Sequence, residues 1–224
     1  HDVALQNLNV VFCLDRAGVV GNDGATHQGQ FDLTMFRCIP NMTIGVPRNE
    51  HELRNLMYTA QLDNKGPFMI RYPRGKGILA DWKNEMHEIE IGKGEEMRSG
   101  TDVAIIGVGP ILYTAQKAIE RLEAENSNLK IGLYDLKFLK PMDNELLHEI
   151  GKRYSKIYTI EDGTIIGGVG SAIEEWMMDN GYQPKIVRLG LPDEFIEHGS
   201  QAELFGMLEL DVEGIYKRMH NAQL

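Results

Sequence analysis

The 224 residues of the chain suffice for one large domain or two ordinary ones, and 42% hydrophobic with 25% charged residues is typical of a soluble globular protein. The 23 basic and 33 acidic residues give a formal net charge of -10 without a basic stripe, so we do not expect nucleic acid as a partner. No apolar run approaches the roughly 20 residues that span a bilayer, so we expect no membrane association.

The cysteines and the first residues indicate the setting of the protein. Cys13 and Cys38 lie in apolar stretches, which predicts reduced, buried thiols of a cytoplasmic protein and neither a disulfide nor a metal pair. Residues 1–8 resemble the end of a helix and lack the basic or apolar character of a targeting peptide. We therefore expect the carboxyl-terminal part of a longer protein, in which an amino-terminal targeting signal would lie outside this sequence.

The beginning of the chain alternates predicted strands and helices. Strands are predicted at 9–14, 42–47 and 67–72, with helices beginning at Phe31 and after the cap residue Asn49. We expect the first of these strands to be buried, because its run is continuously apolar. The order strand, helix, strand, helix, strand is typical of a parallel sheet.

The pattern weakens between residues 75 and 100 and then resumes. An alternating run at 86–91 predicts an edge strand. Further strands are predicted at 102–109, 130–135, 156–160 and 184–189, with helices at 110–125, 144–153, 167–178, 202–208 and 212–219. The sequence therefore predicts an α/β protein of two βα-type domains with mainly parallel sheets. We place the domains at 1–83 and 101–224, joined by a linker or edge strand at 84–100.

The loop at 15–29 combines glycines with ionisable residues. It leaves the carboxyl end of a predicted strand, where ligands usually bind in open α/β sheets. Its four glycines allow positive φ angles and close approach of backbone, while Arg16, Asp23 and His27 could supply chemistry. A merely solvated connection is the alternative, but loops rich in ionisable groups are disproportionately functional.

Arg16 and Arg74 each follow a predicted strand of the first domain. Because the carboxyl ends of parallel strands share one sheet edge, the two guanidinium groups could converge on a phosphate, which arginine binds through two parallel hydrogen bonds. The net charge does not exclude this, since charges beyond about 8 Å are largely screened. From spacing alone, two unrelated surface ion pairs are an equal alternative.

His27 and Asp23 lie four residues apart on the same loop. Histidine can donate or accept a proton near neutral pH, which makes His27 a candidate general acid or base. A surface histidine without a role is the alternative.

Short motifs along the whole chain resemble those of a known family. In chain order they are DRAG at 15–18, THQG at 26–29, FD at 31–32, RCIPNM at 37–42, RYPRG at 71–75, KPMD at 140–143, GVGS at 168–171 and LPDEFIEHG at 191–199. This set resembles the 1-deoxy-D-xylulose-5-phosphate synthases, which are transketolase-like enzymes. On this resemblance, 1–83 is a truncated pyrimidine-binding domain and 101–224 is the transketolase carboxyl-terminal domain.

The resemblance implies a transferase that uses thiamine diphosphate and Mg²⁺. Such enzymes decarboxylate pyruvate and add the two-carbon unit to glyceraldehyde 3-phosphate, and the product feeds isoprenoid, thiamine and pyridoxal synthesis. By this resemblance Arg16 and Arg74 hold the acceptor's phosphate, His27 is the catalytic histidine near the cofactor, and Asp23 is a substrate-binding carboxylate. A cytoplasmic homodimer is expected.

Two parts of the family pattern do not occur in this sequence. They are the motif that binds Mg²⁺ and the diphosphate, and the glutamate that activates the aminopyrimidine. Glu50 and Glu52 lie on a helix in the wrong context to replace that glutamate, and the histidines and acids form no recognisable metal-ligand cluster. We therefore assign no cofactor-binding or metal residue here and expect this polypeptide alone to be inactive.

Two other functions remain open. The chain could be the small subunit of an oxo-acid dehydrogenase or of a split transketolase, although DRAG at 15–18 disfavours this. It could also be a non-catalytic dimerisation module, but such a module would have no need of Arg16, His27 and Arg74 together.

Overall fold

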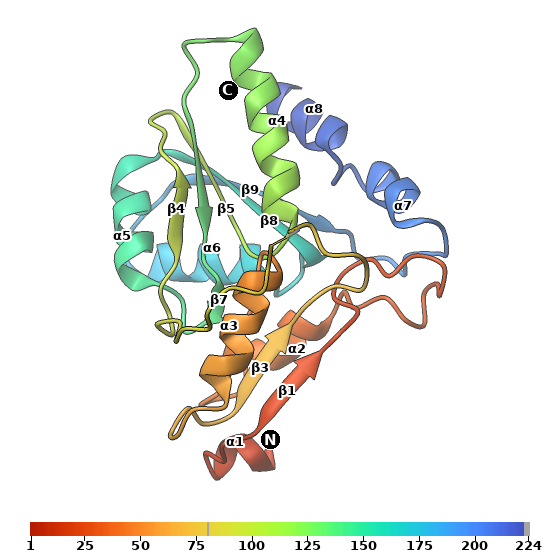
Figure 1. Cartoon of the computed structure of the whole chain (residues 1–224). Helices are drawn as coiled ribbons and strands as arrows, with labels where there is room; N and C mark the ends of the chain where they lie inside the picture. Colours follow the sequence, from red (N-terminus) through yellow and green to blue (C-terminus); the bar gives the residue numbers. More distant parts are fainter. Residues whose placement is uncertain (80, 222–224) are drawn as a thin grey trace.

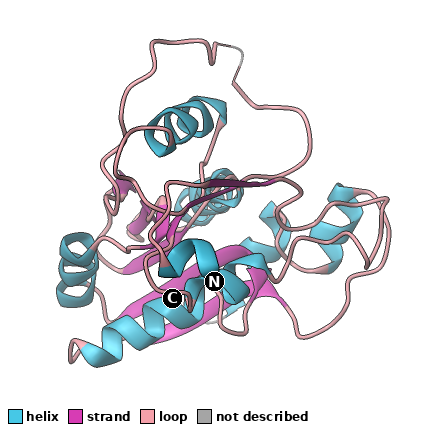
Figure 2. Cartoon of the chain, turned by 90° about the horizontal axis from the view of Figure 1, so that it is seen from below, coloured by secondary structure: helices cyan, strands magenta, loops and turns pink. Residues whose placement is uncertain are grey.

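The structure is a computed structural model that describes residues 1–79 and 81–221, and these residues form two sheets flanked by helices (Figure 1). The smaller sheet has the strand order β1-β3-β2-β7 and the larger one the order β4-β6-β5-β8-β9. Seen from below, helices lie on both sides of the strands (Figure 2). This is the α/β class that the sequence predicts.

The smaller sheet is built mostly from the beginning of the chain. Its strands are β1 (Val11–Leu14), β2 (Thr43–Gly45), β3 (Phe68–Arg71) and β7 (Phe138–Lys140). β1 and β2 run parallel to β3, whereas β7 pairs with β2 in the antiparallel direction. The helices before and between these strands are α1 (Asp2–Leu5), α2 (Asp32–Arg37) and α3 (Glu50–Ala60).

The larger sheet is built from the rest of the chain. Its strands are β4 (Glu95–Arg98), β5 (Val103–Gly107), β6 (Ile131–Asp135), β8 (Lys156–Thr164) and β9 (Lys185–Leu191). β4 is antiparallel to β6, and the other neighbours are parallel. The helices are α4 (Ile111–Glu125), α5 (Asn144–Arg153), α6 (Val169–Asp179), α7 (Gln201–Met207) and α8 (Val212–Asn221).

Alternation along the strands sorts the core into layers. In β3, Phe68 and Ile70 pack with Leu56 and Ala60 of α3. Met69 points to the opposite face, where its hydrophobic cluster continues into the larger sheet. Because one cluster is shared by both sheets, burial of apolar surface stabilises their relative placement.

The start of α3 follows from its sequence. Asn49 has the extended backbone of a helix cap, and its side chain accepts a hydrogen bond from the Glu52 N–H. The segment after β3 then runs along α3: Leu79 N–H donates to Glu50, His87 N–H to Asn55 and Ile89 N–H to Thr59. The helix therefore holds the connection between the sheets through its side chains.

Two predictions about the elements need correction, and one strand was missed. The run at 86–91 is not a strand; the edge strand is β4, which pairs with β6. The sequence reasoning missed β7, because three residues are too short for a periodic signal. β1 is only half buried, since it pairs with β3 alone at the edge of the described sheet.

The cysteines were also predicted wrongly as buried. Both thiols are free, and both residues are exposed. Cys13 lies on edge strand β1, and Cys38 is the residue that ends α2, so both positions meet solvent. The boundaries at 84–100 stay a prediction, and β7 joins the first sheet although it follows that linker.

Candidate functional site

The loop at 15–29 is closed at its base by backbone hydrogen bonds. Gly18 and Gly29 exchange two N–H···O bonds, each 2.9 Å, and Ala17 N–H donates to the Tyr72 carbonyl at 3.0 Å. Tyr72 follows β3, so these bonds fix the base of the loop at the carboxyl ends of β1 and β3. The loop therefore lies where the sequence predicts a ligand site.

Two glycines of this loop are required by close approach. Gly18 has a φ of +67°, and a Cβ there would lie 2.5 Å from Oδ2 of Asp162 on β8. A Cβ on Gly29 would lie 2.0 Å from the Arg16 carbonyl oxygen. A side chain at Gly18 would push the loop away from Asp162, and one at Gly29 would push the two ends of the loop apart.

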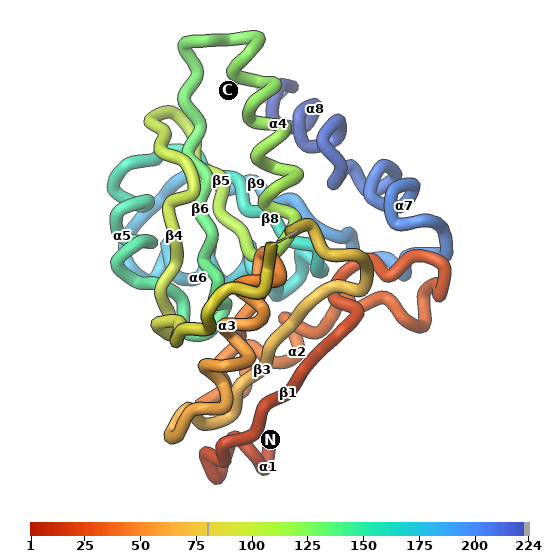
Figure 3. The backbone as a smooth tube through the Cα atoms, viewed as in Figure 1, coloured from red at the N-terminus to blue at the C-terminus, as the bar shows by residue number. Residues whose placement is uncertain are grey.

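The second half of the chain covers the loop. Gln28 donates to the carbonyls of Ile196 and Glu197, and Gln201 donates to the Val19 carbonyl at 2.7 Å. In Figure 3 the red loop and the blue segment that leads to α7 lie side by side. The segments 15–29 and 191–199, which both carry family motifs, are thus in direct contact. Their spacing in the sequence does not predict this contact.

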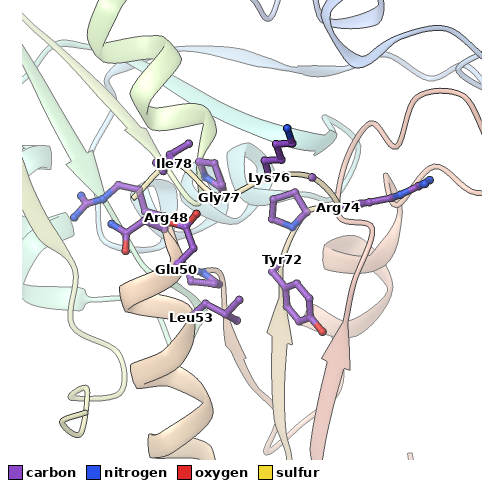
Figure 4. Close-up of a pocket in the computed structure, with 13 residues that line it drawn as sticks. Arg48, Glu50, Leu53, Tyr72, Arg74, Lys76, Gly77 and Ile78 are labelled. Carbon is purple, nitrogen blue, oxygen red and sulfur yellow. The ribbon is translucent and has the colours of Figure 1, made fainter. Parts of the chain in front are cut away.

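The structure brings together two of the predicted site residues, Arg74 and Asp23. Nη1 of Arg74 lies 2.5 Å from Oδ2 of Asp23, 51 residues away in sequence. The Arg74 side chain is 54% exposed and that of Asp23 is 35% exposed, so this pair is open to solvent. Figure 4 shows the Arg74 side chain extending away from Glu50 and Tyr72, toward the ribbon of the glycine loop.

The other two predicted residues lie on the same loop but contact sequence neighbours. Arg16 adopts a φ of +62°, and its guanidinium lies 2.5 Å from Asp15. His27 Nδ1 lies 2.9 Å from the Thr26 hydroxyl. The contacts of Arg16 and His27 in the structure are therefore local, and their convergence with Arg74 stays a prediction.

Arg74 borders two cavities. One, of about 330 Å³, lies between the start of α3 and the segment 72–78, and includes Glu50 and Tyr72 (Figure 4). The other, of about 510 Å³, lies between Arg74 and the second half of the chain, where Asp162 and Gln201 contribute to its wall. Space for a small ligand is therefore available on either side of this arginine.

A buried cluster beneath the loop escaped the sequence reasoning. Arg71, only 1% exposed, donates from Nε to both Asp32 carboxylate oxygens (2.9 and 2.8 Å), from Nη1 to Asp162 (2.5 Å) and from Nη2 to the Gly29 carbonyl (3.0 Å). Burial alone would lower the pKa of Arg71, but the charges and hydrogen bonds of Asp162 and Asp32 raise it above its usual value. The only sequence signal was its place in the RYPRG motif.

Of the buried carboxyl groups outside this cluster, those of Glu161 and Asp135 have raised pKa values. Burial raises the pKa of Glu161 to about 7, although its carboxylate accepts hydrogen bonds from the Gly170 and Val169 N–H groups at the start of α6. Burial and the nearby Glu52 likewise raise the pKa of Asp135 to about 7, against the opposing pull of Arg48 and Lys137. Both pKa values are raised chiefly because burial removes water from the carboxyl group and so disfavours its charged form.

The described part of the chain contains neither a metal-binding cluster nor a membrane-spanning helix. Among residues 1–79 and 81–221, no group of three or more histidine, cysteine, aspartate and glutamate side chains is arranged to hold a metal ion. Within the same residues, no helix has the length and apolar character needed to cross a bilayer.

Family models match most of the sequence. The model "Transketolase, pyrimidine binding domain" matches residues 1–77, and "Transketolase, C-terminal domain" matches residues 92–215. Among curated proteins, a 1-deoxy-D-xylulose-5-phosphate synthase of Bacteroides fragilis is 59% identical over 97% of the chain, and one of Aquifex aeolicus is 44% identical over 99%. The chain spans about a third of the length of these relatives, 33% and 35%.

Solved structures show the same arrangement of elements. A chain described as a split gene transketolase, inactive beta4 tetramer, superimposes with a TM-score of 0.81 at 29% identity, over 98% of this chain and 68% of that one. A mutant transketolase of Pichia stipitis gives a TM-score of 0.69 at 19% identity, over 98% of this chain and 31% of that one, a likeness of fold alone.

Proposed function

Because the chain belongs to the transketolase family, we propose that it forms the pyrimidine-binding and carboxyl-terminal domains of a 1-deoxy-D-xylulose-5-phosphate synthase. The complete enzyme would condense pyruvate with glyceraldehyde 3-phosphate with loss of CO₂, and would supply isoprenoid, thiamine and pyridoxal synthesis. Identity of 59% to a synthase, against 29% to a split-gene transketolase, favours this activity over that of the other transketolase-type enzymes.

The observation that carries the proposal is the solvent-exposed pair of Arg74 and Asp23 at the carboxyl end of the smaller sheet. One N–H group of Arg74 donates to Asp23. A guanidinium has five such donors, so the others remain for the phosphate of the aldehyde substrate. Arg16, at the start of the same loop, would supply a second cation to that phosphate.

We assign proton transfer to His27 and substrate contact to Asp23. An imidazole can donate a proton to, or hydrogen-bond, the oxygen that becomes negative when the new carbon–carbon bond forms. Asp23 orients Arg74 in the present geometry, and its carboxylate can accept a hydrogen bond from a substrate hydroxyl. Both roles require substrate to enter the loop at 15–29.

The thiamine diphosphate cofactor and its Mg²⁺ ion need binding groups that this chain does not supply. The described residues offer no set of three carboxylate, histidine or cysteine side chains for a metal ion, so Mg²⁺ does not fit here, and the sequence lacks the family motif that binds Mg²⁺ and the diphosphate. We propose that a part of the enzyme outside this sequence holds them. It stays a prediction that this polypeptide alone neither binds the cofactor tightly nor turns over.

A second candidate is the small subunit of a split enzyme. The solved split-gene chain shares the fold over almost all of this chain, and its description calls that tetramer inactive. In either case we propose an assembly of two or more copies, which for the synthase is a homodimer. We also propose that the protein is cytoplasmic, because free thiols such as those of Cys13 and Cys38 persist in that compartment. A purely structural dimerisation module would leave the exposed Arg74 and Asp23 pair without a purpose.

The test of the phosphate assignment is Arg74→Ala in the complete enzyme. Loss of one charge-assisted contact should raise the KM for glyceraldehyde 3-phosphate by the equivalent of about 1.5–3 kcal/mol. The KM for pyruvate should change little, because pyruvate has no phosphate. Steady-state kinetics with each substrate varied separately measures both values.

Lys83→Ala is the matched control, since it removes an exposed cation of the segment that follows β3 but lines neither cavity beside Arg74. It should leave both KM values near those of the unaltered enzyme. If Arg74→Ala affects the two substrates equally, Arg74 does not hold the phosphate.

A further inference from the structure

The buried Arg71 touches each structural part that meets at the base of the glycine loop. It lies on β3, and its donors reach the Gly29 carbonyl at the end of the loop, Asp32 at the start of α2 and Asp162 on β8. Only an arginine can serve these partners at once, because its planar head presents donors in several fixed directions. A single side chain therefore ties the loop to both sheets.

Asp162 completes the support from the opposite side. Its Oδ1 accepts the hydrogen bond from Arg71, while its Oδ2 occupies the space that a Cβ on Gly18 would need. Gly18 and Gly29 are hydrogen-bonded to each other, so both ends of the loop rest on the Arg71–Asp162 pair. The segment between these glycines carries Asp23 and His27.

We propose that Arg71 and Asp162 are positioning residues for the substrate loop, through which the larger sheet sets the affinity for the phosphorylated aldehyde at the smaller one. The inference rests on the proposed function for its substrate, but its structural part stands independently. Arg71 is 1% exposed and lies in the wall of neither cavity beside Arg74, so we do not expect it to touch substrate. Asp162 contributes to the wall of the larger cavity, but its carboxylate oxygens lie against Arg71 and Gly18. Both residues act by fixing the position and orientation of the loop at 15–29 relative to the two sheets.

The geometry separates this role from general stabilisation. Arg74, which follows Arg71 by three residues, reaches Asp23 across the mouth of the loop. If the base of the loop shifts, Asp23 moves relative to Arg74 and His27 moves with it, so we expect a weaker phosphate site and a lower kcat. The KM for pyruvate should change little, because pyruvate has no phosphate. A displacement of this kind affects KM for one substrate.

The experiment compares Asp162→Asn with Asp143→Asn in the complete enzyme. Asparagine has nearly the shape of aspartate but lacks its charge, so it weakens the hold on Arg71 without opening a cavity. Asp143 is the matched control, since it is also a buried carboxylate of the second half of the chain, but accepts hydrogen bonds from Gly94 and Leu146, away from the loop. Circular dichroism checks the folding of each variant.

Two readouts are measured for each variant. Hydrogen exchange, followed by mass spectrometry on peptides covering residues 18–29, should become about tenfold faster in Asp162→Asn and stay unchanged in Asp143→Asn. The KM for glyceraldehyde 3-phosphate should rise about tenfold in Asp162→Asn only, with the KM for pyruvate within about twofold. Arg71→Lys, which keeps the charge but loses the planar head, should reproduce both effects, and Asp32→Asn replaces any variant that does not fold.

The outcomes are distinct. Unchanged exchange of the loop in Asp162→Asn overturns the positioning role, whatever the enzyme catalyses. Faster exchange with an equal rise in both KM values, or with neither KM changed, overturns the effect of the pair on substrate affinity. If the unaltered enzyme does not condense these two substrates, the proposed function fails, while the exchange result still decides whether the pair positions the loop.

Discussion

Arg71 and Arg74 are the same residue type, three positions apart, yet their surroundings differ sharply. Arg71 is 1% exposed and is held by two carboxylates and a carbonyl, whereas the Arg74 side chain is 54% exposed and pairs with Asp23 alone. The donors of the buried Arg71 guanidinium are used by protein partners, so a ligand could bind it only by displacing them. An exposed one with donors to spare is available for a ligand.

The largest test of this contrast is Arg71→Met in a stability measurement. Removing one partner of a buried ion pair leaves the buried Asp162 and the partly buried Asp32 without a cation, which should lower the free energy of unfolding by about 3–5 kcal/mol. Urea denaturation followed by circular dichroism measures the change. A loss no greater than that of a surface substitution would mean that the buried cluster does not hold the loop and sheets together.

A second test concerns Glu161, which precedes Asp162 but has amide donors as its partners. Its pKa is raised from 4.5 to about 7 by burial, so the folded state binds this proton more tightly than the unfolded state. The stabilisation is complete below about pH 4.5 and is lost as the pH rises toward about 7. Glu161→Gln should flatten this part of the pH–stability curve by an amount on the order of 1–3 kcal/mol.

The measurement is urea unfolding at several pH values across that window, with Asp143→Asn as the control variant. A Glu161→Gln protein whose stability changes with pH as steeply as that of the unaltered protein would show that this carboxyl group is ionised in the folded state.

The smallest expected effect is that of Arg74→Ala on stability. Because the pair with Asp23 is exposed, its loss should change the free energy of unfolding by about 0–1 kcal/mol. Thermal unfolding of Arg74→Ala beside Arg71→Met measures the two arginines on one scale. A large loss for Arg74→Ala would place it with Arg71 as a structural residue and would weaken its assignment to a ligand.

Much of this contrast follows from the sequence, and part of it does not. The position of Arg74 beside the glycine loop could be expected from the sequence, because a loop and a segment that follow adjacent parallel strands meet at one edge. Its pairing with Asp23 was not predicted. Periodic apolar residues likewise located the main helices and parallel strands, α5 at the predicted residues. These features depend on local patterns, which a single sequence displays.

Contacts between distant segments were not accessible in this way. Arg71 and Asp162 are 91 residues apart, and nothing in either neighbourhood marks them as partners. The exposure of Cys13 depends on β1 being at an edge of the described sheet, which apolar composition does not reveal. Pairing and burial of this kind arise only when the chain has folded.

The short strand β7 has a consequence for any attempt to divide the protein. It comes after the predicted linker, yet it pairs with Ile44 and Gly45 of β2. A piece ending near residue 83 would leave the backbone N–H and C=O groups along that side of β2 uncovered, and such an open margin recruits strands from other molecules. Cutting the polypeptide at its linker would therefore yield a first half that self-associates. The boundary between the halves in sequence is not the boundary between the two hydrogen-bonded sheets.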